Sequence, residues 1–224
     1  MINRFTIYGE RCSGTNYLEK VILSNFDMKL TWDFGYKHFF GFSDFKDSDD
    51  VLFIGIVRDP VQWINSFYKK PWEIPTHISK DAGSFLNSQF YSVINPNPSN
   101  IYYKVKVPTE CMEDRNIYTG ERYRNIFEMR YTKINFLRSD LPKKVKHYLF
   151  VRYEDMLEDF DGTVSKILQF KELKDNIKTP VNVYNYKGIK GKKFIPKNYT
   201  EIGKTEIFSH PDFDLSIEKS FNYI

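Results

Sequence analysis

The sequence predicts an α/β fold of three layers, in which helices cover both faces of a mostly parallel sheet. Apolar strand patterns alternate with helical patterns along the chain, and this order is typical of parallel sheets. Residues 51–57, Val-Leu-Phe-Ile-Gly-Ile-Val, form an unbroken apolar run, as expected of a strand buried on both faces. Residues 147–151 are a second candidate for such a strand. The length of 224 residues and the apolar content of 41% fit one globular domain over residues 1–224.

The first predicted unit joins a strand, a glycine loop and a helix. Phe5 and Ile7 mark the strand, and apolar residues within 17–26 recur at helical spacing. Between them lies the loop Gly9-Glu10-Arg11-Cys12-Ser13-Gly14-Thr15-Asn16. Glycines and a helix N-terminus present backbone N–H groups to an anion, so we expect a bound phosphate rather than an empty turn. The glycine spacing matches a Walker A loop, but Thr15-Asn16 replaces the Lys-Ser/Thr pair which that loop requires.

The second unit begins where the strand 51–57 ends, at Arg58-Asp59-Pro60. Pro60 suits the first turn of a helix, with Asp59 as its cap. Because ligands bind at the carboxyl ends of parallel strands, Arg58 is expected at the same sheet edge as the glycine loop. Together with Ser66 in the following helix, it would hold a second, dianionic phosphate. The alternative is an arginine that caps a strand end beside a surface serine.

The segments between and after these units have weaker patterns. Residues 36–40, Tyr-Lys-His-Phe-Phe, indicate a short strand or a strand end. Residues 71–121 contain scattered aromatics and prolines without a sustained period. They predict an irregular excursion with short helices near residues 83–91 that forms a lid or a wall of a binding site, because long loops often line such sites. The tail from Val181 onward is predicted to be a loop.

The second half of the sheet is predicted from residues 123–170. Residues 123–137 carry a helical pattern, and the strand 147–151 leads through Arg152-Tyr153-Glu154-Asp155 into a helix that ends near residue 170. The two acidic residues at its start favour a helix N-terminus. Arg130, in the preceding helix, either reaches a ligand or is a solvated arginine.

Four motifs, in this order, resemble those of the P-loop sulfotransferases, which use 3′-phosphoadenosine 5′-phosphosulfate as sulfuryl donor. They are residues 9–18, Arg58-Asp59-Pro60 with Ser66, residues 151–155, and Lys187-Gly188. The resemblance spans nearly the whole chain but leaves out the excursion at residues 71–121, which would be variable and would line the acceptor side of the site. It implies a P-loop NTPase-like fold and transfer to a hydroxyl, less often an amine, of a small-molecule or carbohydrate acceptor.

The resemblance also implies where the two ends of the donor bind. The 5′-phosphosulfate would lie on Arg11, Cys12, Ser13, Gly14, Thr15 and Asn16. The 3′-phosphate would be held by Arg58 and Ser66, and covered by Lys187, Gly188 and Lys190. Taken alone, the last of these segments would be a flexible solvated loop. The donor has no triphosphate, so a Walker lysine and a magnesium site are unnecessary, and no metal is expected.

One position departs from the family pattern. Many members carry a lysine two residues before the second glycine of the loop, and here that residue is Cys12. The lysine neutralises charge that develops on the leaving phosphate, a role that Arg11 or Lys37 would have to take. The sequence leaves the choice open. The Cys12 thiol is either reactive, because a helix N-terminus lowers thiol pKa, or a space-filling side chain.

A base is needed for the acceptor hydroxyl, and His38 is the candidate. It stands beside Lys37 after the first helix, where cytosolic members of the family place a catalytic histidine or glutamate. The alternative is a structural histidine beside Phe39 and Phe40. His77, in the excursion, is a weaker candidate base, and His147 and His210 are expected to be structural.

Composition limits the remaining possibilities. A net charge of +4 suits an anionic ligand, and no dense basic stripe indicates nucleic acid. Two cysteines form neither a disulfide framework nor a metal-ligand pattern, which favours a reducing compartment. We find no signal peptide and no apolar run of about 18 residues, so a cytoplasmic protein without a membrane partner is expected. The oligomeric state is not predicted. The alternatives to a sulfotransferase are a degenerate P-loop kinase and a non-catalytic nucleotide-binding module.

Overall fold

The computed structural model describes residues 1–97, 103–173, 181–183 and 197–224. Its central sheet has four parallel strands in the order β2-β1-β3-β6. These strands are β1 (Arg4–Tyr8), β2 (Lys29–Leu30), β3 (Val51–Val57) and β6 (His147–Arg152). Ile54 of β3 lies opposite Ile7 on one side and Leu149 on the other. The predicted parallel sheet is confirmed, and both apolar runs are strands in it.

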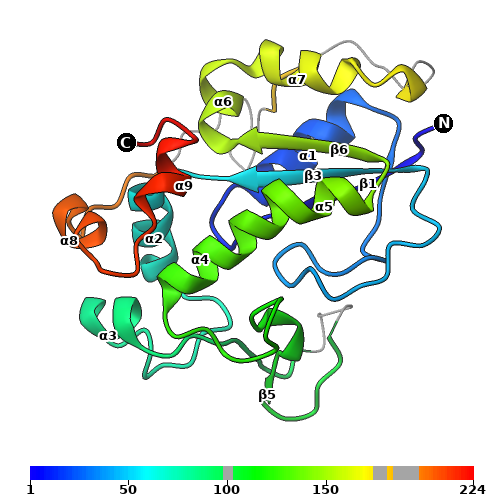
Figure 1. Cartoon of the computed structure of the whole chain (residues 1–224). Coiled ribbons are helices and arrows are strands. Elements are labelled where there is room, and N and C mark those ends of the chain that lie inside the picture. The colour runs from blue at the N-terminus through cyan, green and yellow to red at the C-terminus, as the bar shows by residue number, and fades with distance from the viewer. Residues whose placement is uncertain (98–102, 174–180, 184–196) are drawn as a thin grey trace.

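Helices cover both faces of the sheet, which confirms the three layers (Figure 1). Alternate side chains of a strand point to opposite faces, so Ile7 and Tyr8 enter different cores. The core on the Ile7 face is closed by α1 (Thr15–Asn25), α6 (Tyr153–Glu158) and α7 (Phe160–Leu168). The core on the Tyr8 face is closed by a π-helical turn (Phe136–Asp140) and α5 (Leu141–Lys144), which continue α4 (Ile126–Asn135).

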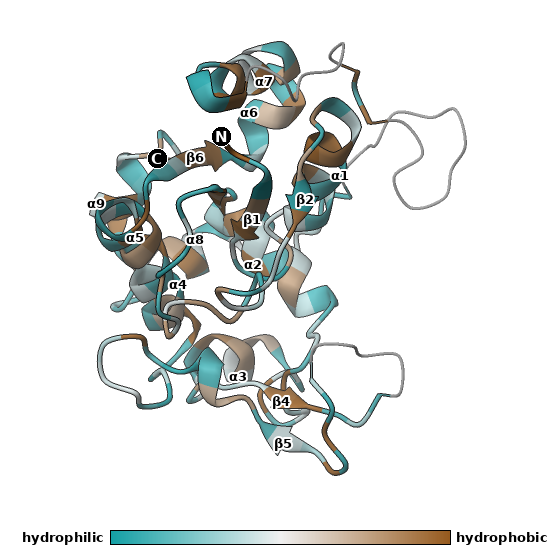
Figure 2. Ribbon diagram, turned by 90° about the vertical axis from the view of Figure 1, so that its right-hand side faces the viewer, coloured by the Kyte–Doolittle hydropathy of each residue, from teal (hydrophilic) through white to brown (hydrophobic). Residues whose placement is uncertain are grey.

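A third cluster packs the excursion against the sheet domain. It joins α2 (Pro60–Lys69), α3 (Ala82–Asn87) and α4 through aromatic side chains such as Trp63, Phe85 and Phe127. The strands β4 (Val93–Ile94) and β5 (Thr109–Glu110) pair antiparallel, and a 3₁₀ turn (Met112–Asp114) follows. Figure 2 shows α3, β4 and β5 together, at the opposite end of the molecule from α6 and α7. The helix expected near residues 83–91 is thus confirmed as α3.

The strand predicted at residues 36–40 is wrong. The segment is a tight turn in which the Phe39 amide donates to the Tyr36 carbonyl at 2.9 Å. Its apolar residues are explained by ring packing, because Phe40 stacks on Tyr8 with centroids 5.0 Å apart. The strand that pairs with this edge of β1 is β2.

Two further expectations need correction. The helix after β6 is divided at Asp159, whose carboxylate caps α7 by accepting from the Gly162 amide at 2.9 Å. The tail also contains α8 (Lys204–Phe208) and α9 (Leu215–Lys219), where only a loop was predicted, after a 3₁₀ turn at Lys171–Leu173. No helix among the described residues is long and apolar enough to cross a membrane.

Candidate active site

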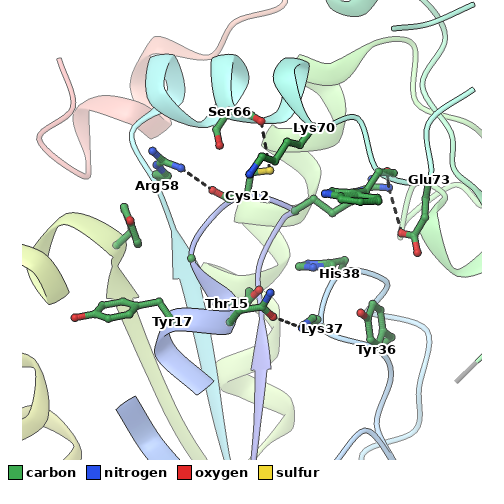
Figure 3. A pocket seen from close by; sticks show the side chains of 15 residues that line it. Cys12, Thr15, Tyr17, Tyr36, Lys37, His38, Arg58, Ser66, Lys70 and Glu73 are labelled. Atoms are coloured by element: carbon green, nitrogen blue, oxygen red, sulfur yellow. Dashed lines mark hydrogen bonds and ion pairs between the residues drawn. The ribbon is translucent and has the colours of Figure 1, made fainter. Parts of the chain in front are cut away.

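A cavity of about 490 Å³ opens where β1 and β3 end, in front of the first turn of α1 (Figure 3). It brings together predicted residues from three separate segments: Arg11, Cys12, Gly14, Thr15, Asn16, Lys37, His38, Arg58 and Ser66. Five further residues line the cavity without having been predicted as site residues: Tyr17, Tyr36, Lys70, Glu73 and Tyr153. Trp72, from the excursion predicted to line a binding site, lines the cavity as well. Lys187, Gly188 and Lys190 lie outside the described residues.

The glycine loop is shaped by close packing at both of its glycines. At Gly9, a Cβ atom would lie 2.5 Å from Ile56 Cγ2. Gly14 has φ +99°, and a Cβ there would lie 2.3 Å from the Tyr153 ring. Gly14 also begins α1 without a side-chain cap. The first amides of a helix have no acceptor within it, so those of Thr15 and Asn16 are available to an anion.

Of the six loop residues predicted to bind the donor, Arg11 to Asn16, only Ser13 does not line the cavity. It is buried, and its hydroxyl donates to the Glu10 carbonyl at 2.6 Å. The amide of Ser13 donates to the same carbonyl at 3.1 Å. Ser13 therefore stabilises the bend of the loop from within.

Arg58 stands at the end of β3, as the sequence predicts. Its Nη1 donates to the Cys12 carbonyl at 3.0 Å, and its guanidinium lies 4.8 Å from the Tyr153 ring centroid. Its Nε is buried without a hydrogen-bond partner. A buried donor without an acceptor destabilises the protein by about 1–3 kcal/mol, more for a charged group.

Both expectations for Arg130 are wrong. This arginine is buried and does not line the cavity. Its guanidinium pairs with Glu218 of α9, with Nε 2.5 Å from Oε1, and donates through Nη2 to the Arg58 carbonyl at 2.9 Å. Arg130 therefore attaches the C-terminal helix to the end of β3 and supports the backbone of Arg58.

The Cys12 side chain fills space between the loop and α2. Its residue has φ 65°, in the left-handed region, and its thiol donates to the Ser66 carbonyl at 3.6 Å. Burial raises the pKa of the Cys12 thiol, and the nearby arginines offset this only in part. A protonated thiol is a poor nucleophile, so the reactive-thiol alternative loses its basis.

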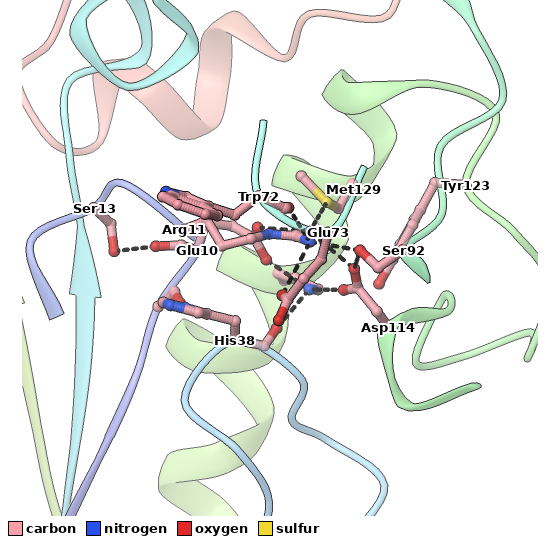
Figure 4. A network of polar contacts seen from close by, with 12 residues as sticks. Glu10, Arg11, Ser13, His38, Trp72, Glu73, Ser92, Asp114, Tyr123 and Met129 are labelled. Carbon is pink, nitrogen blue, oxygen red and sulfur yellow. Dashed lines mark hydrogen bonds and ion pairs between the residues drawn. The ribbon is translucent and has the colours of Figure 1, made fainter. Parts of the chain in front are cut away.

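Arg11 and Lys37 occupy different environments. Arg11 lines the cavity, but its guanidinium is directed into the protein, where it reaches Ser92 Oγ at 2.5 Å and Asp114 Oδ2 at 2.9 Å (Figure 4). Lys37 lies over the start of α1, where its ammonium contacts Asn16 Oδ1. Partial burial lowers the pKa of Lys37, although Glu19 and Glu73 act in the opposite direction.

His38 lines the cavity with one ring nitrogen already assigned. Its Nδ1 lies 2.7 Å from the Gly9 carbonyl oxygen. A carbonyl can only accept, so Nδ1 carries the proton and Nε2 keeps its lone pair. Burial lowers the pKa of His38 well below its ordinary value, and the cations Lys37, Arg11 and Lys133 add to this effect. The imidazole is therefore neutral and able to accept a proton.

A buried network of charges supports this histidine from behind (Figure 4). Lys133 Nζ donates to the His38 carbonyl at 2.8 Å, contacts Asp114, and lies 2.6 Å from Glu10 Oε1. With Arg11, the network has two buried cations facing two buried carboxylates. It joins the loop, the 36–40 turn, α4 and the excursion. No spacing in the sequence indicated it.

Comparison with known proteins adds a family match. A family model described as the sulfotransferase domain matches residues 46–217. The match includes Arg58, Ser66 and β6, whereas the glycine loop and His38 precede it. Searches of the curated proteins and of the solved structures gave no significant match.

Proposed function

The chain belongs to the sulfotransferase domain family, and we propose that it moves a sulfuryl group from 3′-phosphoadenosine 5′-phosphosulfate to a hydroxyl, or less often an amine. One observation carries the proposal. One cavity is lined by the first turn of α1, by the guanidinium-bearing Arg58 and by the neutral His38. These are two anion-binding elements and a proton acceptor, which this transfer requires.

The donor would span the cavity from α2 to α1. The 5′-phosphosulfate would accept from the amides of Thr15 and Asn16, and the 3′-phosphate from Arg58 and the Ser66 hydroxyl. Lys70, at the end of α2, adds positive charge to the same wall. A volume of about 490 Å³ is within the range of nucleotide-sized ligand pockets.

The C-terminal contribution of Lys187, Gly188 and Lys190 remains part of the proposal. The described residues just before them, 181–183, are attached to α1. The Val181 amide donates to Asn25 Oδ1 at 2.5 Å, and the Tyr17 hydroxyl, on the cavity wall, donates to Asn182 Oδ1 at 3.1 Å. These contacts bring the chain to the cavity a few residues before Lys187.

The transfer would proceed by in-line attack. The acceptor oxygen forms a bond to sulfur while the bond from sulfur to the 5′-phosphate oxygen breaks, and His38 Nε2 takes the acceptor proton. Of the two candidates for the leaving-group cation, Lys37 is favoured because its ammonium lies at the first turn of α1. Arg11 is already paired with Asp114. Lys37, in the neighbouring turn at residues 36–40, would therefore supply the positive charge that many family members carry on a lysine at the position of Cys12.

A nucleotide titration tests the donor assignment. Adenosine 3′,5′-bisphosphate, the expected nucleotide product, should raise the melting temperature, whereas AMP and ATP–Mg²⁺ should have much smaller effects. AMP is the matched control, because it lacks only the 3′-phosphate. Equal stabilisation by AMP would remove the role given to Arg58 and Ser66. Preference for ATP–Mg²⁺ would favour a kinase instead.

A further inference from the structure

The side chains that line the cavity differ in charge on the two sides of His38. The side that carries Arg58 and Lys70 is basic, whereas Figure 3 shows Tyr36 and Glu73 on the opposite side of His38 from Arg58. Trp72, which precedes Glu73 in the chain, also lines the cavity and is 67% exposed. Of the described residues that line the cavity, Glu73 alone carries a carboxylate. An acidic group in a cavity otherwise suited to anions needs an explanation.

Backbone contacts fix the position of Glu73. Its φ of 63° is in the left-handed region, which an ordinary side chain adopts at a cost of about 1–3 kcal/mol. The conformation is held by β4, since the Val93 amide donates to the Glu73 carbonyl at 2.8 Å. The preceding carbonyl, of Trp72, accepts from Arg11 Nη1 at 3.4 Å. The surrounding structure therefore holds a strained residue with its side chain at the cavity.

The carboxylate of Glu73 is compensated in charge but keeps its capacity to accept hydrogen bonds. Its Oε2 lies 4.0 Å from Arg11 Nη1, which is beyond hydrogen-bond distance. Burial raises the pKa of Glu73, and Arg11 counters this effect. Among the described residues, none donates a hydrogen bond to this carboxylate. Its lone pairs are thus available to a ligand, while Arg11 reduces the attraction that it would exert on a cation.

We propose that Glu73 selects a neutral, hydroxyl-rich acceptor, namely a sugar unit. The sugar stacks on the exposed face of Trp72 and donates one hydroxyl to Glu73, while another hydroxyl faces His38. Aromatic faces provide the apolar contact area of such a site, and an acceptor-only carboxylate fixes the orientation. A carboxylate on the acceptor is disfavoured because Glu73 only accepts hydrogen bonds and offers it no donor. This inference rests on the proposed sulfuryl transfer.

Matched 4-nitrophenyl glycosides test the proposal. The β-glucoside and β-galactoside are neutral probes, the β-glucuronide is the anionic counterpart, and the β-glucosaminide is the cationic one. 4-Nitrophenol reports whether the protein transfers sulfate at all. We expect at least tenfold higher kcat/KM for a neutral glycoside than for either charged one. Glu73→Gln should raise KM for the neutral glycoside at least tenfold. It should also lower the ratio of kcat/KM for the neutral glycoside to kcat/KM for the glucuronide. Glu121→Gln, at an exposed glutamate of the excursion, is the matched control.

Binding of adenosine 3′,5′-bisphosphate separates the inference about Glu73 from the proposed sulfuryl transfer on which it depends. In Glu73→Gln, the dissociation constant of this nucleotide should stay within twofold, which also shows that the variant is folded. The proposal is overturned if a charged glycoside is preferred, if Glu73→Gln changes neither KM nor the discrimination, or if 4-nitrophenol is sulfated and no neutral glycoside is. A protein that neither binds the nucleotide nor sulfates any probe overturns the proposed function as well.

Discussion

Replacing Lys133 by methionine should destabilise the protein by about 3–5 kcal/mol at pH 7, because it leaves two buried carboxylates, Glu10 and Asp114, with Arg11 as their shared cation. Lys133 is 1% exposed and contacts Asp114, which is fully buried. Burial alone would raise the pKa of Asp114, but Lys133 and Arg11 hold this pKa below its usual range. Without Lys133, Asp114 can stay in the folded protein by binding a proton. From a reference pKa near 3.9, that costs about 4 kcal/mol at pH 7 and about 1.5 kcal/mol at pH 5.

The sign of the pH dependence follows from proton linkage. The folded variant binds a proton that the unfolded chain does not bind at pH 7, so its free energy of unfolding falls as pH rises. Urea titrations at pH 5 and pH 7 measure this difference. Lys143→Met, at an exposed lysine of α5, is the control and should change stability by less than about 0.5 kcal/mol. A loss below about 1 kcal/mol in Lys133→Met, or equal losses at both pH values, would contradict the network.

Three further predictions concern the cavity. Arg58→Gln should weaken the binding of adenosine 3′,5′-bisphosphate, measured by calorimetry, by about 10- to 150-fold, which corresponds to about 1.5–3 kcal/mol for hydrogen bonds to a charged group. The binding of AMP should weaken much less, and equal losses for the two nucleotides would argue against a 3′-phosphate site. His38→Ala should lower turnover about 10²- to 10⁴-fold with nucleotide affinity kept, and wild-type turnover should decline only below pH 6.5, the ordinary pKa of histidine. Cys12→Ala should keep turnover within about threefold, since its thiol is protonated; a larger loss would give Cys12 a role in catalysis.

The sheet could be predicted because its strands are buried on both faces. Such strands give continuous apolar runs, and residues 51–57 and 147–151 stand out for that reason. The turn at 36–40 shows the limit of this signal, because its aromatic rings pack into cores without joining the sheet. The short helices α8 and α9 also gave no helical period of apolar residues in the sequence. They depend on tertiary contacts, such as the pair of Glu218 with Arg130.

The site was predicted in part, for a related reason. The glycine loop and Arg58 have local signatures, since phosphate binding needs particular residues next to strand ends. The buried ion pairs have none. In the sequence, Lys133 and Asp114 look like ordinary surface charges, and only the folded chain brings them together behind His38. Glu73 was missed because it lies in the segment that the family resemblance did not cover.

Sulfuryl transfer itself is the most direct test of the function proposed for this cavity. Radiolabelled 3′-phosphoadenosine 5′-phosphosulfate should transfer its label to 4-nitrophenol or to a neutral glycoside in the presence of the wild-type protein, without added metal. Under the same conditions, His38→Ala should bind adenosine 3′,5′-bisphosphate with unchanged affinity but transfer label at least about 100-fold more slowly. Tight binding of that nucleotide without any transfer by the wild type, or full transfer by His38→Ala, would contradict the proposed mechanism.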